Sequence, residues 1–264
     1  MKITLFFAKI EGEVNKMGLK YQQKYRVPFY ESDAFQKMRL SSILAVALQI
    51  SGEQSTELGR SDVWVSEHYG LFWAVIEYDV KIIRFPMFNE EITIETEATS
   101  YNKFFCYRRF SFLDSQGEVM LEIASTWVLM DKETRKIDRV LDDIVDPYAS
   151  EKISKILRPH KFKKREAFEN PTLMTYPVRF SALDMNGHVN NAKYYDWAAD
   201  MVDFEFRKSH VPSRIFIKYN HEVLYGEEIH AAMSWEGDVS HHNFNEGSTQ
   251  IEIHWTEHTA SHPF

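Results

Sequence analysis

The stretch FSALDMNGHVNNAKYYDWAADMV, residues 180–202, places Asp184, Asn186 and His188 at alternate positions in front of an amphipathic segment. Aspartate, asparagine and glycine before a helix are common turn and cap residues, so a lone Asp-x-Asn would usually be structural. Asn190 and Asn191 bring the polar side chains to five within eight residues, which is more than one turn requires. This excess raises the possibility of a functional site.

A second stretch, FYESDAFQKMRLSSILAVALQIS at residues 29–51, has the same layout, and residue 29 aligns with residue 180 at an offset of 151 positions. The alignment matches Asp33 with Asp184, but it places Phe35 and Lys37 opposite Asn186 and His188. One copy therefore folds without the amide and the imidazole. Since the fold does not demand these two groups, the internal repeat favours a site in the second half.

Each stretch continues into an apolar pattern with helical spacing, for which Ser41 and Asn191 are the expected caps. The apolar positions are Leu40, Ile43, Leu44, Leu48 and Ile50 in the first half, and Tyr194, Trp197, Met201 and Phe204 in the second. Runs rich in β-branched and aromatic residues follow, which indicates antiparallel strands. These runs are 71–85, 90–100, 103–114, 117–131, 213–225, 227–237 and 248–258.

The order of strand, loop, long helix and antiparallel strands, given twice, predicts an α+β protein built from two similar halves. We expect an amino-terminal extension over residues 1–19, a first repeat over 20–141, a linker over 142–172 and a second repeat over 173–264. The linker should hold a short helix from about Tyr148 to Leu157 and then a basic, polar segment. HHNFNEG at 241–247 is expected to be a hairpin loop.

The composition is that of an ordinary globular protein, with 264 residues, 44% hydrophobic residues and a formal net charge of −8. This charge gives no overall attraction to nucleic acid or to an anionic membrane. The apolar run near the amino terminus is too short to span a membrane. Cys106 is the only cysteine, which excludes an internal disulfide and fits a reducing cytoplasm.

Glu222, in YNHEVLYGEE, interrupts an otherwise apolar strand-like run 34 residues after His188. A glutamate on a strand commonly faces solvent, and the sequence alone does not relate it to His188.

The chain resembles acyl-acyl carrier protein thioesterases of the bacterial type, which are related to the plant enzymes. Three segments carry this resemblance: YRVPFYESDAFQKMRLSSIL, DMNGHVNNAKYYDW and YNHEVLYGEEI. The resemblance extends from about Lys20 to His258 and implies a tandem double hotdog fold. Each of its two repeats is a long helix wrapped by an antiparallel sheet.

The resemblance implies that Asp184, Asn186, His188 and Glu222 are catalytic and that the enzyme needs neither cofactor nor metal. The plant relatives carry a cysteine after that glutamate, where this chain has Val223, so a cysteine nucleophile is not expected. A positioned water would attack the thioester carbonyl instead, with Glu222 or His188 as general base and Asp184 orienting the network. Asn186 would hold the water or the carbonyl, and the amides at the helix start would stabilise the oxyanion.

The implied substrate is a fatty acyl chain on acyl carrier protein. Four apolar residues of the first repeat could line the acyl tunnel, although each could equally be plain core: Leu44, Leu48, Phe72 and Trp73. Since the carrier protein is acidic, docking would need a local basic patch, for which the linker cations are candidates, above all Lys161, Lys163, Lys164 and Arg165. A solvated surface is the alternative for this run of charge.

Three other functions stay open on the sequence: an acyl-CoA thioesterase, a hotdog 3-hydroxyacyl dehydratase and a non-catalytic acyl-binding module. The polar set in one half argues against the binding module, because holding a lipid needs none of these groups. Metal binding by His241 and His242, or by His221 with the catalytic set, lacks ligands at suitable spacing. We expect a monomer or a weak homodimer.

Overall fold

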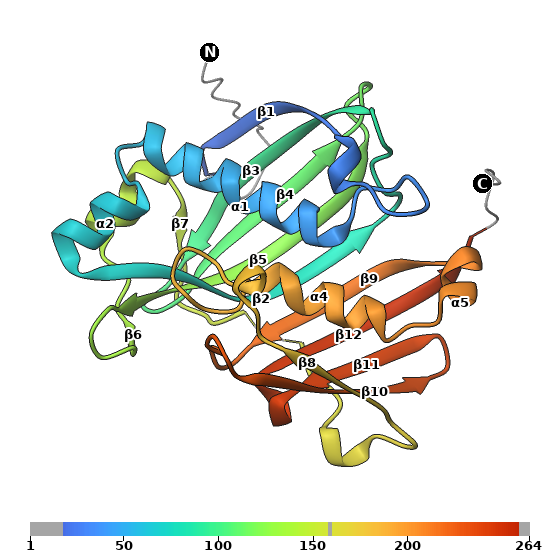
Figure 1. The fold of residues 1–264 in the computed structure, drawn as a ribbon. Coiled ribbons are helices and arrows are strands. Elements are labelled where there is room, and N and C mark those ends of the chain that lie inside the picture. The colour runs from blue at the N-terminus through green and yellow to red at the C-terminus, as the bar shows by residue number, and fades with distance from the viewer. Residues whose placement is uncertain (1–17, 158–159, 259–264) are drawn as a thin grey trace. The chain divides into compact units, whose positions relative to one another are not determined.

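The computed structural model describes residues 18–157 and 160–258, and the extension expected over residues 1–19 lies almost entirely outside them (Figure 1). The chain divides into two compact units. Among the described residues, unit 1 contains 18–27, 46–76 and 89–157, and unit 2 contains 28–45, 77–88 and 160–258. The loop in front of the first long helix therefore belongs to unit 2, although it lies early in the sequence.

Unit 1 is an antiparallel sheet with strand order β1-β3-β4-β5, followed by β2. The strands are β1 (Lys20–Arg26), β2 (Leu71–Ile82), β3 (Glu91–Tyr101), β4 (Cys106–Leu113) and β5 (Val119–Asp131), with the short β6 (Ile137–Asp138) and β7 (Glu151–Lys152) at the margins. The helices are α1 (Leu40–Glu57), α2 (Asp62–Tyr69), α3 (Asp142–Val145) and the 3-10 turn η2 (Asp146–Tyr148). Residues 40–45 of α1 and 77–82 of β2 are assigned to unit 2.

The core of unit 1 follows from the alternation of side chains along the strands. Phe110 and Phe112 of β4 project to the same face, and both are fully buried. Phe110 pairs with Ile123 of β5, and Phe112 pairs with Leu121, so buried apolar rows cross the sheet. Burying side chains of this size stabilises the fold by about 1.5–3 kcal/mol each, before entropy is counted.

Unit 2 repeats the arrangement with strand order β9-β12-β11-β10-β8. The strands are β8 (Thr172–Pro177), β9 (His210–Tyr219), β10 (Glu228–Glu236), β11 (Val239–Phe244) and β12 (Thr249–Glu257), and the helices are α4 (Asn191–Asp200) and α5 (Phe204–Ser209). Short 3-10 turns lie at η1 (Phe29–Glu31), η3 (Arg165–Ala167), η4 (Phe180–Ala182) and η5 (Asn245–Gly247). Residues 77–81 of β2 pair with β9 inside this unit.

Several local expectations were wrong. HHNFNEG is not a loop at its start, because His241 and His242 lie within β11. The second long helix ends at Asp200, and Asp203 caps a separate α5 by accepting from the amides of Glu205 and Phe206. Asn190 caps α4 by accepting from the amide of Ala192. The first cap was also misplaced, since Ser41 lies inside α1.

The linker helix lies earlier than expected, at Asp142–Val145, with η2 directly after it. Residues 151 and 152, where a helix was predicted, pair in parallel with β3 as the strand β7. The helix α2 had no counterpart in the sequence analysis. Ser61 caps it through the amide of Trp64, and Gly70 ends it in the left-handed conformation at φ 67°. Only glycine adopts that conformation without steric cost.

Candidate active site

The loop at residues 183–190 is shaped by the carboxylate of Asp184. Its Oδ1 accepts hydrogen bonds from the backbone amides of Asn186 at 2.8 Å and His188 at 3.2 Å. The amide of Asp184 in turn donates to the carbonyl of His188 at 2.8 Å. Gly187 makes the turn possible with φ 81°, in the left-handed region that disfavours other residues. Asp184 thus determines the backbone conformation from which His188 projects.

The matching loop of the first repeat has the same hydrogen bonds without the polar side chains. Oδ1 of Asp33 accepts from the amides of Phe35 at 2.8 Å and Lys37 at 2.9 Å, and the Asp33 amide donates to the carbonyl of Lys37. Gln36 takes the left-handed position there, at φ 62°. Because both loops need the aspartate, its first role is to form the turn.

Two backbone contacts bring the loop containing Glu222 beside His188. His188 forms an isolated antiparallel bridge with Leu224, and the amide of Val189 donates to the carbonyl of Val223 at 2.9 Å. As a result, Nε2 of His188 lies 3.4 Å from Oε2 of Glu222. The exposed fraction is 17% for the His188 side chain and 40% for that of Glu222. The pair is therefore partly shielded yet reachable from solvent.

The same two contacts identify the residue that corresponds to Glu222 in the first repeat. Lys37 bridges Met87, and the amide of Met38 donates to the carbonyl of Pro86 at 2.8 Å. Counting back two residues from Met87, as from Leu224 to Glu222, gives Phe85. The first loop therefore carries Phe35, Lys37 and Phe85 where the second carries an amide, an imidazole and a carboxylate.

The surroundings of the pair are partly apolar and partly hydrogen-bonded. Exposed apolar side chains stand on the two loops and the preceding turn, namely Phe180, Met185, Leu224 and Tyr225. Asn186 is also exposed. Behind the loop, the hydroxyl of Tyr219 donates to the carbonyl of Asn191 at 2.9 Å and so ties β9 to the first turn of α4. Burial raises the pKa of Tyr219 well above 10, so the hydroxyl remains a donor.

The apolar residues predicted to bind the acyl chain occupy different environments. Leu44 is almost fully buried, and Leu48 is partly buried. The guanidinium of Arg135 lies over the ring of Phe72, with Cζ 4.6 Å from the ring centroid. Trp73 packs against a buried cluster of unit 1 formed by Val65, Leu71, Tyr101, Leu129, Ile144 and Val145. None of these contacts identifies a ligand, so their role as acyl contacts remains a prediction.

The predicted basic patch is partly engaged within unit 2. Nζ of Lys163 lies 2.8 Å from Oε2 of Glu236, whereas Lys161 and Lys164 are exposed. Arg165 lies over the ring of Phe168 at 5.6 Å. Three of the four predicted docking residues therefore keep charge that is not neutralised by an ion pair in the part of the chain that the structure describes.

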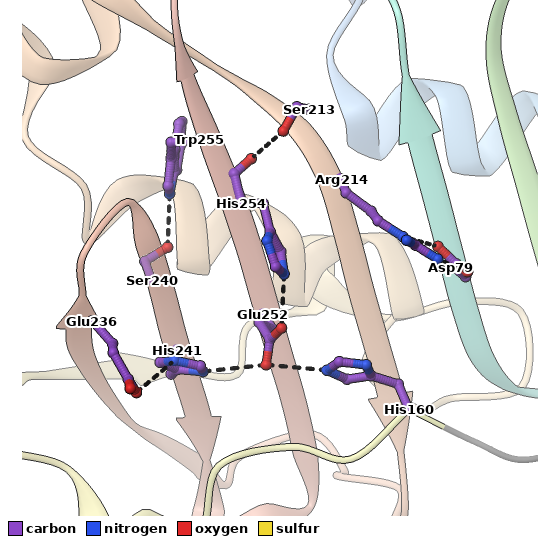
Figure 2. Close-up of polar contacts among 10 residues, drawn as sticks. All are labelled: Asp79, His160, Ser213, Arg214, Glu236, Ser240, His241, Glu252, His254 and Trp255. Atoms are coloured by element: carbon purple, nitrogen blue, oxygen red, sulfur yellow. Dashed lines mark hydrogen bonds and ion pairs between the residues drawn. The ribbon is translucent and has the colours of Figure 1, made fainter.

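A glutamate surrounded by three histidines holds the linker against the sheet of unit 2, which the sequence analysis missed (Figure 2). Glu252 lies 2.8 Å from His254 and 3.3 Å from His241 on the sheet, and 3.1 Å from His160 of the linker. The His160 ring also stacks on Phe216, with centroids 3.7 Å apart. Burial acts to raise the pKa of Glu252, but its interactions with the three histidines outweigh this effect and lower the pKa to about 2.

The single cysteine, Cys106, lies in a buried environment of unit 1. Burial raises the pKa of Cys106 to about 12, so its thiol is protonated and is a poor nucleophile. Within residues 18–157 and 160–258, no group of three or more His, Cys, Asp or Glu side chains is arranged to hold a metal ion. A search of the same residues for helices with the length and apolarity of a membrane span found none.

Two similar helix-and-sheet repeats define the fold class as a double hotdog, and the second repeat carries a histidine–glutamate pair on its loop. The fold is shared with solved structures. A thioesterase from Bacteroides thetaiotaomicron that acts on acyl-ACP has a TM-score of 0.78 at 18% identity, with 90% of this chain and 98% of that chain covered. The 12:0-ACP thioesterase from Umbellularia californica has a TM-score of 0.77 at 17% identity, with 90% and 98% covered.

The family is shown by closer matches. Residues 18–148 match the acyl-ACP thioesterase N-terminal domain, and residues 165–258 match the C-terminal domain. A putative oleoyl thioesterase from Lactobacillus plantarum is 31% identical, with a TM-score of 0.86 and with 92% of this chain and 98% of that chain covered. The chain belongs to the acyl-ACP thioesterase family, as the motif predicted.

Plant relatives are more distant and longer. The chloroplastic oleoyl-acyl carrier protein thioesterase of Coriandrum sativum is 26% identical over 86% of this chain and 66% of its own length. An oleoyl-acyl carrier protein thioesterase of Arabidopsis thaliana is 24% identical over 86% of this chain and 67% of its own length. The chain thus spans about two thirds of the length of these relatives.

Proposed function

We propose that the protein hydrolyses the thioester of a fatty acyl chain on acyl carrier protein and releases the free fatty acid. The observation that carries this proposal is the His188–Glu222 pair, 3.4 Å apart, on a loop whose repeat copy carries Lys37 and Phe85 instead. Family membership and the oleoyl- and palmitoyl-acyl carrier protein thioesterases among the relatives support the substrate class. A cytoplasmic location, expected from the single cysteine, is part of the proposal.

In the proposed mechanism, a water molecule held near the pair attacks the thioester carbonyl carbon. Glu222 or His188 takes the proton from this water, and the tetrahedral intermediate collapses with cleavage of the carbon–sulfur bond. The thiol leaves with a proton, and the acyl group leaves as the carboxylic acid. The separation of 3.4 Å is long for a hydrogen bond, but catalytic contacts often tighten only when substrate binds.

The other polar residues of the loop have supporting roles in this mechanism. Asn186, which is exposed, would hold the water or the carbonyl oxygen through its amide. Asp184 would act through the turn that positions His188, because its two hydrogen bonds come from backbone amides. Among the backbone N–H groups at the first turn of α4, that of Asn191 would stabilise the developing oxyanion, because those of Ala192 and Lys193 donate to Asn190. The exposed side chains of Phe180 and Tyr225 would contact the substrate.

The deciding experiment compares thiol release from the same long-chain acyl group on acyl carrier protein and on coenzyme A, with His188→Ala as control. Faster release from the carrier protein, lost in the variant, is the expected result. A preference for coenzyme A would keep the chemistry and replace the carrier. Absence of release from both would overturn the proposal, and turnover of a 3-hydroxyacyl substrate without thiol release would then identify a dehydratase.

A further inference from the structure

Neighbouring arginines on β4 have opposite environments in unit 1. Arg109 projects to one face of the sheet, where its Nη2 lies 2.8 Å from Oε2 of Glu97, as in an ordinary ion pair. Arg108 projects to the other face, where its Nη1 donates to Oε1 of Gln54 at 2.6 Å and to Oγ1 of Thr96 at 2.8 Å. No carboxylate pairs with Arg108 among the residues that the structure describes.

The environment of Arg108 makes an unpaired charge costly. Burial lowers its pKa, with the phenol of Tyr148 and the thiol of Cys106 as the nearby groups that oppose this effect. The guanidinium also lies over the Tyr148 ring at 5.4 Å. A buried charge usually has a counter-charge, and neutral hydrogen bonds replace its lost hydration only in part. The described part of the chain therefore surrounds a cation here without supplying an anion.

Arg108 lies where the inner face of the sheet changes from fully buried to partly accessible. The row containing Thr96, Phe110 and Ile123 is fully buried. In the next row Arg108 pairs with Ser125, and in the row beyond it Cys106 pairs with Trp127. Arg108, Cys106 and Trp127 all keep some accessible surface. The guanidinium thus borders both the dry core and a partly accessible, largely apolar end of the unit.

The unused donors of Arg108 define what could bind there. Both acceptors in the described residues contact Nη1, so none of those residues accepts a hydrogen bond from Nε or Nη2. These two N–H groups form the planar fork that matches the two oxygens of a carboxylate. The aromatic and thiol side chains beside it suit an aliphatic chain. We propose that Arg108 binds the carboxylate of an aliphatic ligand inside unit 1.

Two sources could supply such a ligand, and naming them rests on the proposed function. One is the released fatty acid, held by its own carboxylate after hydrolysis. The other is an acyl substrate that carries a second carboxylate at its far end. Both place the same group on the same fork. The second source makes Arg108 a determinant of substrate specificity, whereas the first makes it a site of product inhibition.

The test measures binding of dodecanoate and of dodecanol by calorimetry, apart from any turnover. Arg108→Met should weaken dodecanoate binding about tenfold or more, as expected for lost hydrogen bonds to a charged group, and should leave dodecanol unchanged. Arg109→Met is the matched control and should bind both like the wild type. Equal dodecanoate affinity in the wild type and in Arg108→Met would overturn the inference, even if thioesterase activity stands.

Arg108→Lys guards against loss of folding in the methionine variant, which thermal unfolding would reveal. It keeps the charge but not the fork, so it should also bind dodecanoate more weakly than the wild type, and unchanged affinity would contradict the proposal. Two further measurements distinguish the two sources of the carboxylate. The first uses His188→Ala, which should bind acyl carrier protein substrates without turning them over. Tighter binding of ω-carboxydodecanoyl than of dodecanoyl carrier protein identifies the substrate. Competitive inhibition of the wild type by dodecanoate, relieved in Arg108→Met, identifies the product.

Discussion

At the scale of single residues, the repeat supplies its own controls. His188 and Glu222 form a pair in the second half, and Lys37 and Phe85 take their places in the first. Lys37 is itself partly buried, which lowers its pKa, although Asp33 acts to raise it. The two loops share their backbone hydrogen bonds, so a difference between matched variants reports on side-chain chemistry rather than on loop folding.

We predict that His188→Ala and Glu222→Ala each lower kcat by about 10²–10⁴-fold, the range for loss of a general acid or base. Lys37→Ala, at the matching position, should change kcat little. The measurement is thiol release under saturating substrate, with thermal unfolding to verify that each variant is folded. Equal losses at His188 and Lys37 would contradict the assignment of activity to one half.

The two turn aspartates make a second matched pair. Asp184→Ala and Asp33→Ala each remove a carboxylate that accepts two backbone amides, and each should lower the free energy of unfolding by roughly 1–3 kcal/mol. Only Asp184→Ala should also lower kcat, because only that turn carries His188. Urea unfolding and thiol release measure the two effects. An equal loss of kcat in both variants would contradict a specific role of Asp184 in positioning His188.

At the scale of secondary structure elements, the sheet of unit 2 depends on contacts across strands and across its outer face. His241 of β11 stands directly opposite Glu252 of β12 in the register, and His254 lies two residues further along the same strand. His160 brings the linker to the same carboxylate (Figure 2). One ionised glutamate thus links two strands and the linker.

This network predicts an acid-sensitive contribution to stability. The pKa of Glu252 is about 2 in the folded protein, below the roughly 4.3 of an unperturbed glutamate. A lowered folded-state pKa means that its contribution is present above about pH 4.3 and is lost as the pH falls toward 2. Glu252→Gln should therefore be less stable than the wild type at pH 6, with the difference shrinking toward pH 2. Urea midpoints across this range test it, and a constant difference would refute it.

At the scale of the whole molecule, a chain with net charge −8 is proposed to meet an acidic carrier, so local charge must govern the encounter. Lys161 and Lys164 are exposed in the linker, and Lys163 is held by Glu236. We predict that Lys161→Glu with Lys164→Glu raises KM for acyl carrier protein substrates but not for acyl-CoA. Lys136→Glu, at an exposed site in unit 1, is the control. Equal increases in KM for acyl carrier protein and acyl-CoA substrates would contradict a role of the linker in docking.

The sequence by itself determined the repeat and the loop Asp184–His188, because these depend on local patterns of a few residues, and the resemblance carried by its motifs implied the family and the double hotdog fold. Tertiary structure alone decided that Glu222 meets His188, that β11 pairs His241 with Glu252, and that Arg108 faces inward with no carboxylate paired to it among the described residues. Each of these depends on strand register and on which face a side chain takes, and a shift of one residue would reverse the face. The strand register and the face of each side chain are both set by non-local strand pairing, which no short stretch of sequence encodes.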